Sequence, residues 1–91
     1  MSISRDKEAY SIIESSLTGS GDSINKDISE VDGVCIITAF TDSFSRATPK
    51  CDIIAYKLIV AGFSLREISI KQNDSNVQMM FYVNVGSIKA L

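Results

Sequence analysis

The segment Thr48–Gly62 constrains the fold of this chain more than any other, because apolar residues would occupy most of its circumference in a helix. Thr48 can cap the first turn, and Pro49 is well tolerated at a first helical position, so a helix is predicted to begin there. Gly62 supplies the left-handed residue that often ends a helix, and Phe63 can fold back onto the last turn. The segment is therefore predicted to be a buried central helix.

Two sets of apolar residues make up the surface of this predicted helix. The first recurs at helical spacing and indicates a core-facing stripe: Cys51, Ile54, Leu58 and Ala61. The second fills most of the remaining circumference: Ile53, Tyr56, Ile59 and Val60. A helix with so narrow a polar stripe should be covered on two sides, by a sheet on one and by a second helix or a second subunit on the other.

The rest of the chain predicts one amphipathic helix and four strands. The helix is expected over residues 5–17 and the strands over residues 26–31, 34–40, 67–71 and 77–84. Asp32-Gly33 is the dipeptide that suits a type I′ hairpin turn. Residues 24–31 also fit two turns of helix, so that segment stays open between strand and helix.

These elements predict the α+β class. We expect a single small domain over residues 1–91 with the order αββαββ, and with residues 1–4 and 86–91 frayed. The sheet should have four mainly antiparallel strands, with both helices packed on one face.

The composition argues against catalysis. The chain contains no histidine, which removes Ser-His-Asp and Cys-His nucleophilic systems and the commonest transition-metal ligand. The two cysteines, Cys35 and Cys51, lack metal or redox spacing and are expected to be buried thiols. We therefore expect no catalytic residues, no metal and no cofactor.

The N-terminus and the apolar runs bear on localisation. MSISRDKEAY is too polar and too acidic for a signal peptide, and no run approaches the ~20 apolar residues that span a bilayer. We expect an acidic cytoplasmic protein without membrane association.

One face of the predicted sheet is a candidate binding surface. If Cys35, Ile37 and Ala39 face the helices, alternate residues of two strands share the opposite side, and an apolar face there needs a cover. These candidate partner-binding residues are Val34, Ile36, Phe40, Met80 and Tyr82. The cover is either the chain's own first helix or tail, or a protein partner, including a second copy in a homodimer.

The charges are unevenly distributed and suggest an alternative. Residues 1–45 carry three basic and eight acidic side chains, whereas residues 46–91 carry six basic and three acidic ones. Sorted onto one face, the basic set could bind nucleic acid: Arg46, Lys50, Lys57, Arg66 and Lys71.

The function predicted from the sequence is therefore a noncatalytic protein-binding module that acts as a small regulator, inhibitor or chaperone-like adaptor through the apolar sheet face. A nucleic-acid-associated regulator is the alternative, and an enzyme is the least favoured class.

Overall fold

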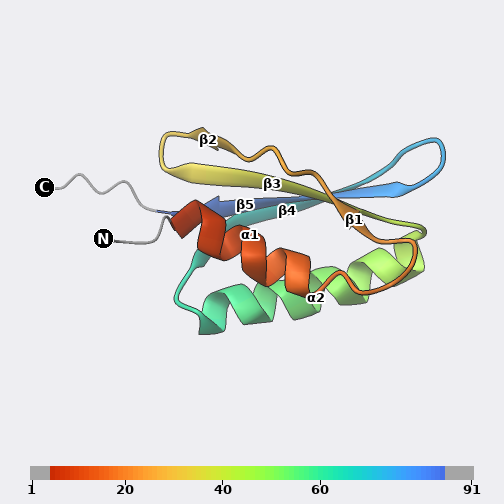
Figure 1. Ribbon diagram of the computed structural model, residues 1–91, viewed down its shortest axis with the longest axis horizontal. Helices are drawn as coiled ribbons and strands as arrows, with labels where there is room; N and C mark the ends of the chain where they lie inside the picture. Colours follow the sequence, from red (N-terminus) through yellow and green to blue (C-terminus); the bar gives the residue numbers. More distant parts are fainter. Residues whose placement is uncertain (1–4, 86–91) are drawn as a thin grey trace, which may run out of the picture.

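The computed structural model describes residues 5–85, which form two helices and five strands (Figure 1). The helices are α1 (Arg5–Ser15) and α2 (Phe44–Val60). The strands are β1 (Ser23–Ile24), β2 (Ser29–Val31), β3 (Val34–Thr41), β4 (Ser64–Gln72) and β5 (Val77–Asn84). The α+β class is confirmed, while the expected fraying of residues 1–4 and 86–91 lies outside the described residues.

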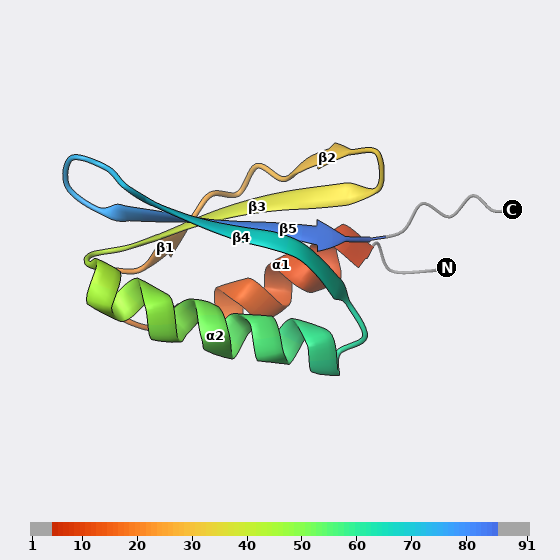
Figure 2. The same cartoon turned by 180° about the vertical axis from the view of Figure 1, so that it is seen from behind.

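The strands form one antiparallel sheet in which β5 lies between β3 and β4. β1 and β2 both pair with the other edge of β3. Both helices lie on the same side of this sheet, as predicted (Figures 1 and 2). The fold is thus a two-layer arrangement with helices on one side only.

The predicted strand over residues 26–31 is wrong in its extent, and the element order is αβββαββ with five strands instead of four. The edge strand is interrupted between β1 and β2, which pair with β3 in registers that differ by two residues. The Asn25 amide still continues the pairing of β1 by donating to the Thr38 carbonyl of β3 at 2.8 Å. The Asn25 side-chain oxygen then accepts a hydrogen bond from the Asp27 amide at 2.9 Å, which forms a local turn. The helical alternative for residues 24–31 is excluded.

The hairpin turn between β2 and β3 has the predicted form. Asp32 and Gly33 have φ angles of 52° and 78°, the two positive values that a type I′ turn requires. The turn pairs Val31 directly with Val34. It thereby places both valines on the same side of the sheet.

Helix α2 begins earlier than predicted. Its N-cap is Ser43, and Thr48 lies inside the helix, where its hydroxyl donates to the Phe44 carbonyl at 3.3 Å. The additional turn brings Ala47 into the core, where it is fully buried. Tertiary packing therefore outweighs the local start signal at Thr48 and Pro49.

The C-terminal end of α2 agrees with prediction. Gly62 has a φ of 97°, and the Phe63 amide donates to the Leu58 carbonyl while the Gly62 amide donates to the Ile59 carbonyl. This is the Schellman pattern, which satisfies carbonyls of the last turn. Phe63 returns to the core, but Ala61, expected on the buried stripe, is exposed because the helix has ended there.

The core lies between the helices and the inner side of the sheet. Alternate residues of the two central strands are fully buried on that side. They come from β3 and β5: Cys35, Ile37, Ala39, Val77, Met79, Phe81 and Val83. The helices contribute Ala9, Ile13, Ala47, Cys51, Ile54 and Leu58 to the same cluster.

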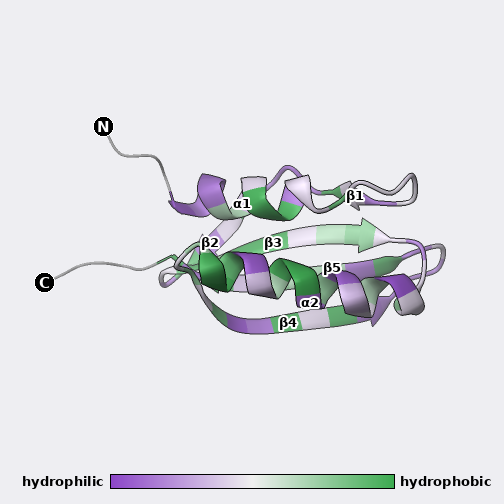
Figure 3. Ribbon diagram, turned by 90° about the horizontal axis from the view of Figure 1, so that it is seen from below, coloured by the Kyte–Doolittle hydropathy of each residue, from purple (hydrophilic) through white to green (hydrophobic). Residues whose placement is uncertain are grey.

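The sequence predicts that a second helix or a second subunit covers the outer side of α2, and within the described residues no second helix does so. α1 lies beside α2 and packs Ala9 and Ile13 into the shared core (Figure 3). The second apolar set of α2 is exposed: Ile53 (53%), Tyr56 (70%), Ile59 (59%) and Val60 (67%). An 11-residue helix packed against the flank of α2 leaves that side open.

Neighbouring residues of β5 test the assignment of the two sheet sides. Phe81→Ala should lower the free energy of unfolding by about 3–5 kcal/mol, because it leaves a cavity in the core. Met80→Ala, on the opposite side and half-buried, should cost about 1 kcal/mol or less. Urea unfolding of both variants measures the difference; equal losses would contradict the assignment.

Candidate protein-binding surface

The side of the sheet that faces away from α1 and α2 is the candidate surface, and we call it the open sheet face. Within residues 5–85 no helix covers it (Figures 1 and 2). The register of β3 and β5 pairs Ile36 with Tyr82 and Thr38 with Met80 on this face. It therefore carries all five residues predicted as partner-binding: Val34, Ile36, Phe40, Met80 and Tyr82.

These five residues differ in how much surface they present. Val34 is only 8% exposed, so it lies at the bottom of the open sheet face and presents little surface to a partner. Ile36, Phe40, Met80 and Tyr82 are half-buried. The Tyr82 hydroxyl lies 4.0 Å from the Met80 sulfur, so these two side chains lie against each other along β5.

A shallow depression of about 320 Å³ occupies one end of the open sheet face. Val34, Ile36 and Tyr82 line it together with Val31, which is 58% exposed. The remaining lining residues are charged: Asp32, Arg66 and Glu67. The site is therefore an apolar floor with a charged rim, the general plan of protein interfaces.

The sequence prediction missed part of this depression. Val31 could have been found, because pairing across the Asp32-Gly33 turn places it on the same face as Val34. Arg66 and Glu67 carry no such signal. They line the same depression where the register of β4 against β5 shifts between Leu65 and Glu67, and no sequence pattern marks this irregularity.

The five candidate nucleic-acid residues do not form one surface. Arg46, Lys50 and Lys57 line a groove of about 530 Å³ between α2 and the C-terminal end of α1. Arg66 and Lys71 lie on β4, and Arg66 lines the depression on the open sheet face. The structure thus brings together three of the five cations.

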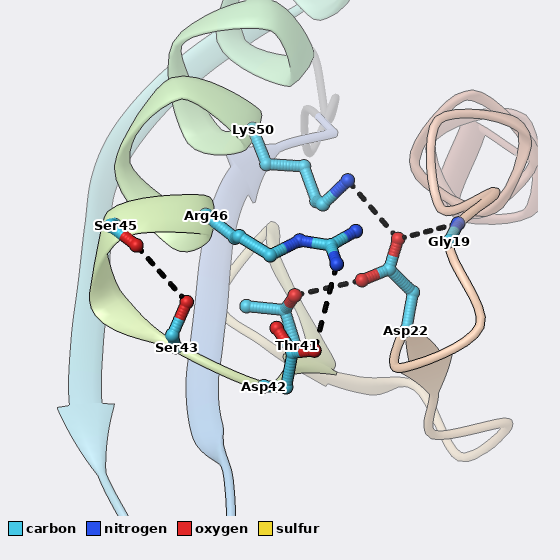
Figure 4. A network of polar contacts seen from close by, with 8 residues as sticks. All are labelled: Gly19, Asp22, Thr41, Asp42, Ser43, Ser45, Arg46 and Lys50. Atoms are coloured by element: carbon cyan, nitrogen blue, oxygen red, sulfur yellow. Dashed lines mark hydrogen bonds and ion pairs between the residues drawn. The ribbon is translucent and has the colours of Figure 1, made fainter.

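Arg46 and Lys50, the two cations of this groove nearest the N-terminus of α2, each form an ion pair with a carboxylate (Figure 4). Arg46 lies 3.5 Å from a carboxylate oxygen of Asp42, and Lys50 lies 3.0 Å from one of Asp22. Lys57 donates to the Ser16 hydroxyl at 3.2 Å. The carboxylates reduce the charge that the groove could offer to a phosphate.

Asp22 is the centre of this polar network. Its side chain is fully buried and accepts hydrogen bonds from the Thr41 hydroxyl at 2.7 Å and the Gly19 amide at 2.9 Å, besides pairing with Lys50. Burial acts to raise the pKa of Asp22, but the bonds from Thr41 and Gly19 and the charge of Lys50 outweigh it and lower the pKa below its ordinary value. The network therefore ties the loop after α1 to α2.

Neither thiol is placed for chemistry. Burial raises the pKa of Cys35 to about 12 and that of Cys51 to about 11, and nearby carboxylates add to both shifts. Thiols with such pKa values are almost wholly protonated at neutral pH and are poor nucleophiles. Among residues 5–85, no group of three or more cysteine, aspartate or glutamate side chains is arranged to hold a metal ion.

Comparison with known proteins adds no family to this description. No protein-family model matches the chain, and no curated protein matches it significantly in sequence. In the part of the chain that the structure describes, no helix has the length and apolar character to cross a membrane.

Removal of the buried carboxylate should destabilise the protein. Asp22→Ala should lower the free energy of unfolding at pH 7 by about 2–3 kcal/mol, because the hydrogen-bond donors and Lys50 lose their partner. The pKa of Asp22 is lower in the folded state than in the unfolded state. The extra stability of the wild type is therefore fully present above pH 3.8, the ordinary pKa of an aspartate, and is lost as the pH falls through the lowered pKa. Urea unfolding between pH 3 and 7 measures this. Asp42→Ala, at a half-exposed carboxylate, is the control and should cost ~0.5 kcal/mol or less.

The cysteines should react only after unfolding. In the native protein at pH 8, both thiols are buried and protonated, so alkylation by iodoacetamide should be slower than for a free thiol by at least about tenfold. In denaturant both should react at the ordinary rate. Mass spectrometry of peptides from timed samples gives the alkylation rate of each cysteine. Rapid labelling of Cys51 in the native protein would contradict its burial.

Proposed function

We propose that this chain is a noncatalytic protein-binding module that acts in the cytoplasm as a small regulator, inhibitor or chaperone-like adaptor. The observation that carries the proposal is the depression on the open sheet face, with its apolar floor of Val34, Ile36 and Tyr82. Aromatic residues and methionine are enriched at the centres of protein interfaces, and Tyr82 and Met80 are adjacent on this face.

The chemistry of the described residues supports binding over catalysis. Both thiols are buried with raised pKa values, and Asp22, the buried carboxylate, is already satisfied by Thr41, Gly19 and Lys50. No histidine is present anywhere in the chain to serve as a general base. An interface requires none of these groups.

The rim of the depression suggests how a partner would be selected. Arg66 and Glu67 stand on one side of the apolar floor and Asp32 on the other. Charged groups at a rim contribute to specificity and association rate, while the floor contributes affinity. A partner that presents an apolar side chain flanked by charges of both signs fits this surface.

Affinity capture of the tagged protein from its own host, with and without nuclease, tests the proposal. The wild type should retain a stoichiometric protein after nuclease treatment. Ile36→Ser/Tyr82→Ser should recover at least about tenfold less of it, because the change removes an aromatic anchor and its neighbour. Circular dichroism of the variant checks that it is folded.

A matched control changes the same two residue types on the opposite side of the molecule. Ile53→Ser/Tyr56→Ser alters exposed residues of α2 and should retain the partner. Equal capture by both variants would contradict a role for the open sheet face. Recovery that disappears with nuclease would instead support a nucleic-acid partner and direct attention to Arg46, Lys50 and Lys57.

A further inference from the structure

The outer side of α2 carries an apolar stripe that the described chain leaves without a cover. Pro49, Ile53, Tyr56 and Val60 follow one another at spacings of four, three and four residues, and all are exposed. This is the spacing of core positions in a pair of helices wound around each other. In heptad terms, Pro49 and Tyr56 take d positions, and Ile53 and Val60 take a positions.

The charged residues beside the stripe fit one arrangement of a second copy. Asp52 takes a g position, and Lys57, five residues later, takes the following e position. In a parallel pair, a g residue of one helix lies next to the e residue five positions later in the other. Asp52 of each copy would therefore meet Lys57 of the other, giving two ion pairs related by the two-fold axis.

An antiparallel pair fits the same residues poorly. There, e positions face e positions and g positions face g positions, so Lys57 of one copy would face Lys50 of the other. Asp52 would face Ile59, which leaves a carboxylate against an apolar side chain. The pattern of charge thus distinguishes the two directions.

The groups concerned are available in the single chain. Asp52 is exposed and forms no ion pair with any described residue. The Lys57 side chain is exposed, and among residues 5–85 its one hydrogen bond is that to the Ser16 hydroxyl at 3.2 Å. Arg46, an a position one heptad before Ile53, pairs with Asp42, so the apolar stripe begins at Pro49.

The size of the surface is that of a small interface. The exposed parts of Ile53, Tyr56, Ile59 and Val60 amount to on the order of 500 Å² per copy, within the range of functional apolar patches. This is less than the roughly 800 Å² per partner of a standard-size complex, so the pairing is expected to form a small interface. The sheet lies on the opposite side of α2, and the C-terminal end of α1 lies along one edge of the stripe, beside Pro49, Ile53 and Lys57 (Figure 3).

We infer that the outer stripe of α2 is a self-association surface through which two copies of this chain pair in parallel, with Asp52 of each bound to Lys57 of the other. This inference is independent of the proposed function, which uses the opposite side of the molecule.

A charge-swap cycle on the full-length chain, followed by sedimentation equilibrium, tests the inference. The wild type should have twice the 9.9 kDa mass of one chain. Asp52→Lys and Lys57→Asp should each weaken the dimer by roughly tenfold or more, because each places like charges together. The double variant should restore the dissociation constant to within about threefold of the wild type.

Two further variants separate this surface from others. Tyr56→Ser, at an exposed position that the fold does not need, should weaken the dimer by at least about a hundredfold. Ile36→Ser/Tyr82→Ser, on the open sheet face, should leave the mass unchanged.

Three results would overturn the inference. The first is a wild type that remains monomeric at all accessible concentrations. The second is a dimer that Lys57→Asp strengthens and Asp52→Lys does not weaken, which indicates antiparallel pairing. The third is a dimer that the sheet variant dissociates and Tyr56→Ser does not.

Discussion

The packing of α2 against the inner side of the sheet, over β4, β5 and β3, is the interaction on which the other features of this structure depend (Figure 3). The 17-residue helix is about 25 Å long, and an eight-residue strand such as β3 spans about 27 Å, so one helix covers the length of the central strands. Its buried residues form one stripe, and a stripe touches one layer only. Residues on the opposite side of α2 consequently point away from the sheet. The same one-sided packing leaves the far side of the sheet without a helix.

The features predicted correctly from the sequence are those with local causes. The two-residue period of β3 and β5 separates buried from outward positions, and Asp32-Gly33 and Gly62 adopt the positive φ angles expected for them. The placement of Val34, Ile36, Phe40, Met80 and Tyr82 on one face follows from this period once the strands are paired. A single sequence is sufficient for such features because each depends on neighbours within a few residues.

The features that were missed depend on contacts between distant segments. The start of α2 is set by burial of Ala47, and the break between β1 and β2 by a two-residue change in their register against β3. Arg46, Lys50 and Lys57 were correctly marked as basic, but the sequence gives no sign that Asp22, 28 residues before Lys50, neutralises one of them. The basic set was therefore expected to present more positive charge than it does. Ile53, Tyr56 and Val60 were recognised as needing a cover, but the pattern does not show whether α1 provides it.

The position of the two uncovered apolar surfaces determines how self-association and partner binding could influence each other. If both used the open sheet face, a second copy would occlude the depression at Tyr82, and rising concentration of the chain would inhibit partner binding by mass action. If copies pair through α2, the two sheet faces point outward from the two-fold axis and remain accessible. Such a dimer presents two identical sites, so a partner with two epitopes would bind with avidity set by their separation. The surface through which two copies pair thus decides the effect of pairing. Pairing through the sheet face would inhibit partner binding, whereas pairing through α2 would strengthen it.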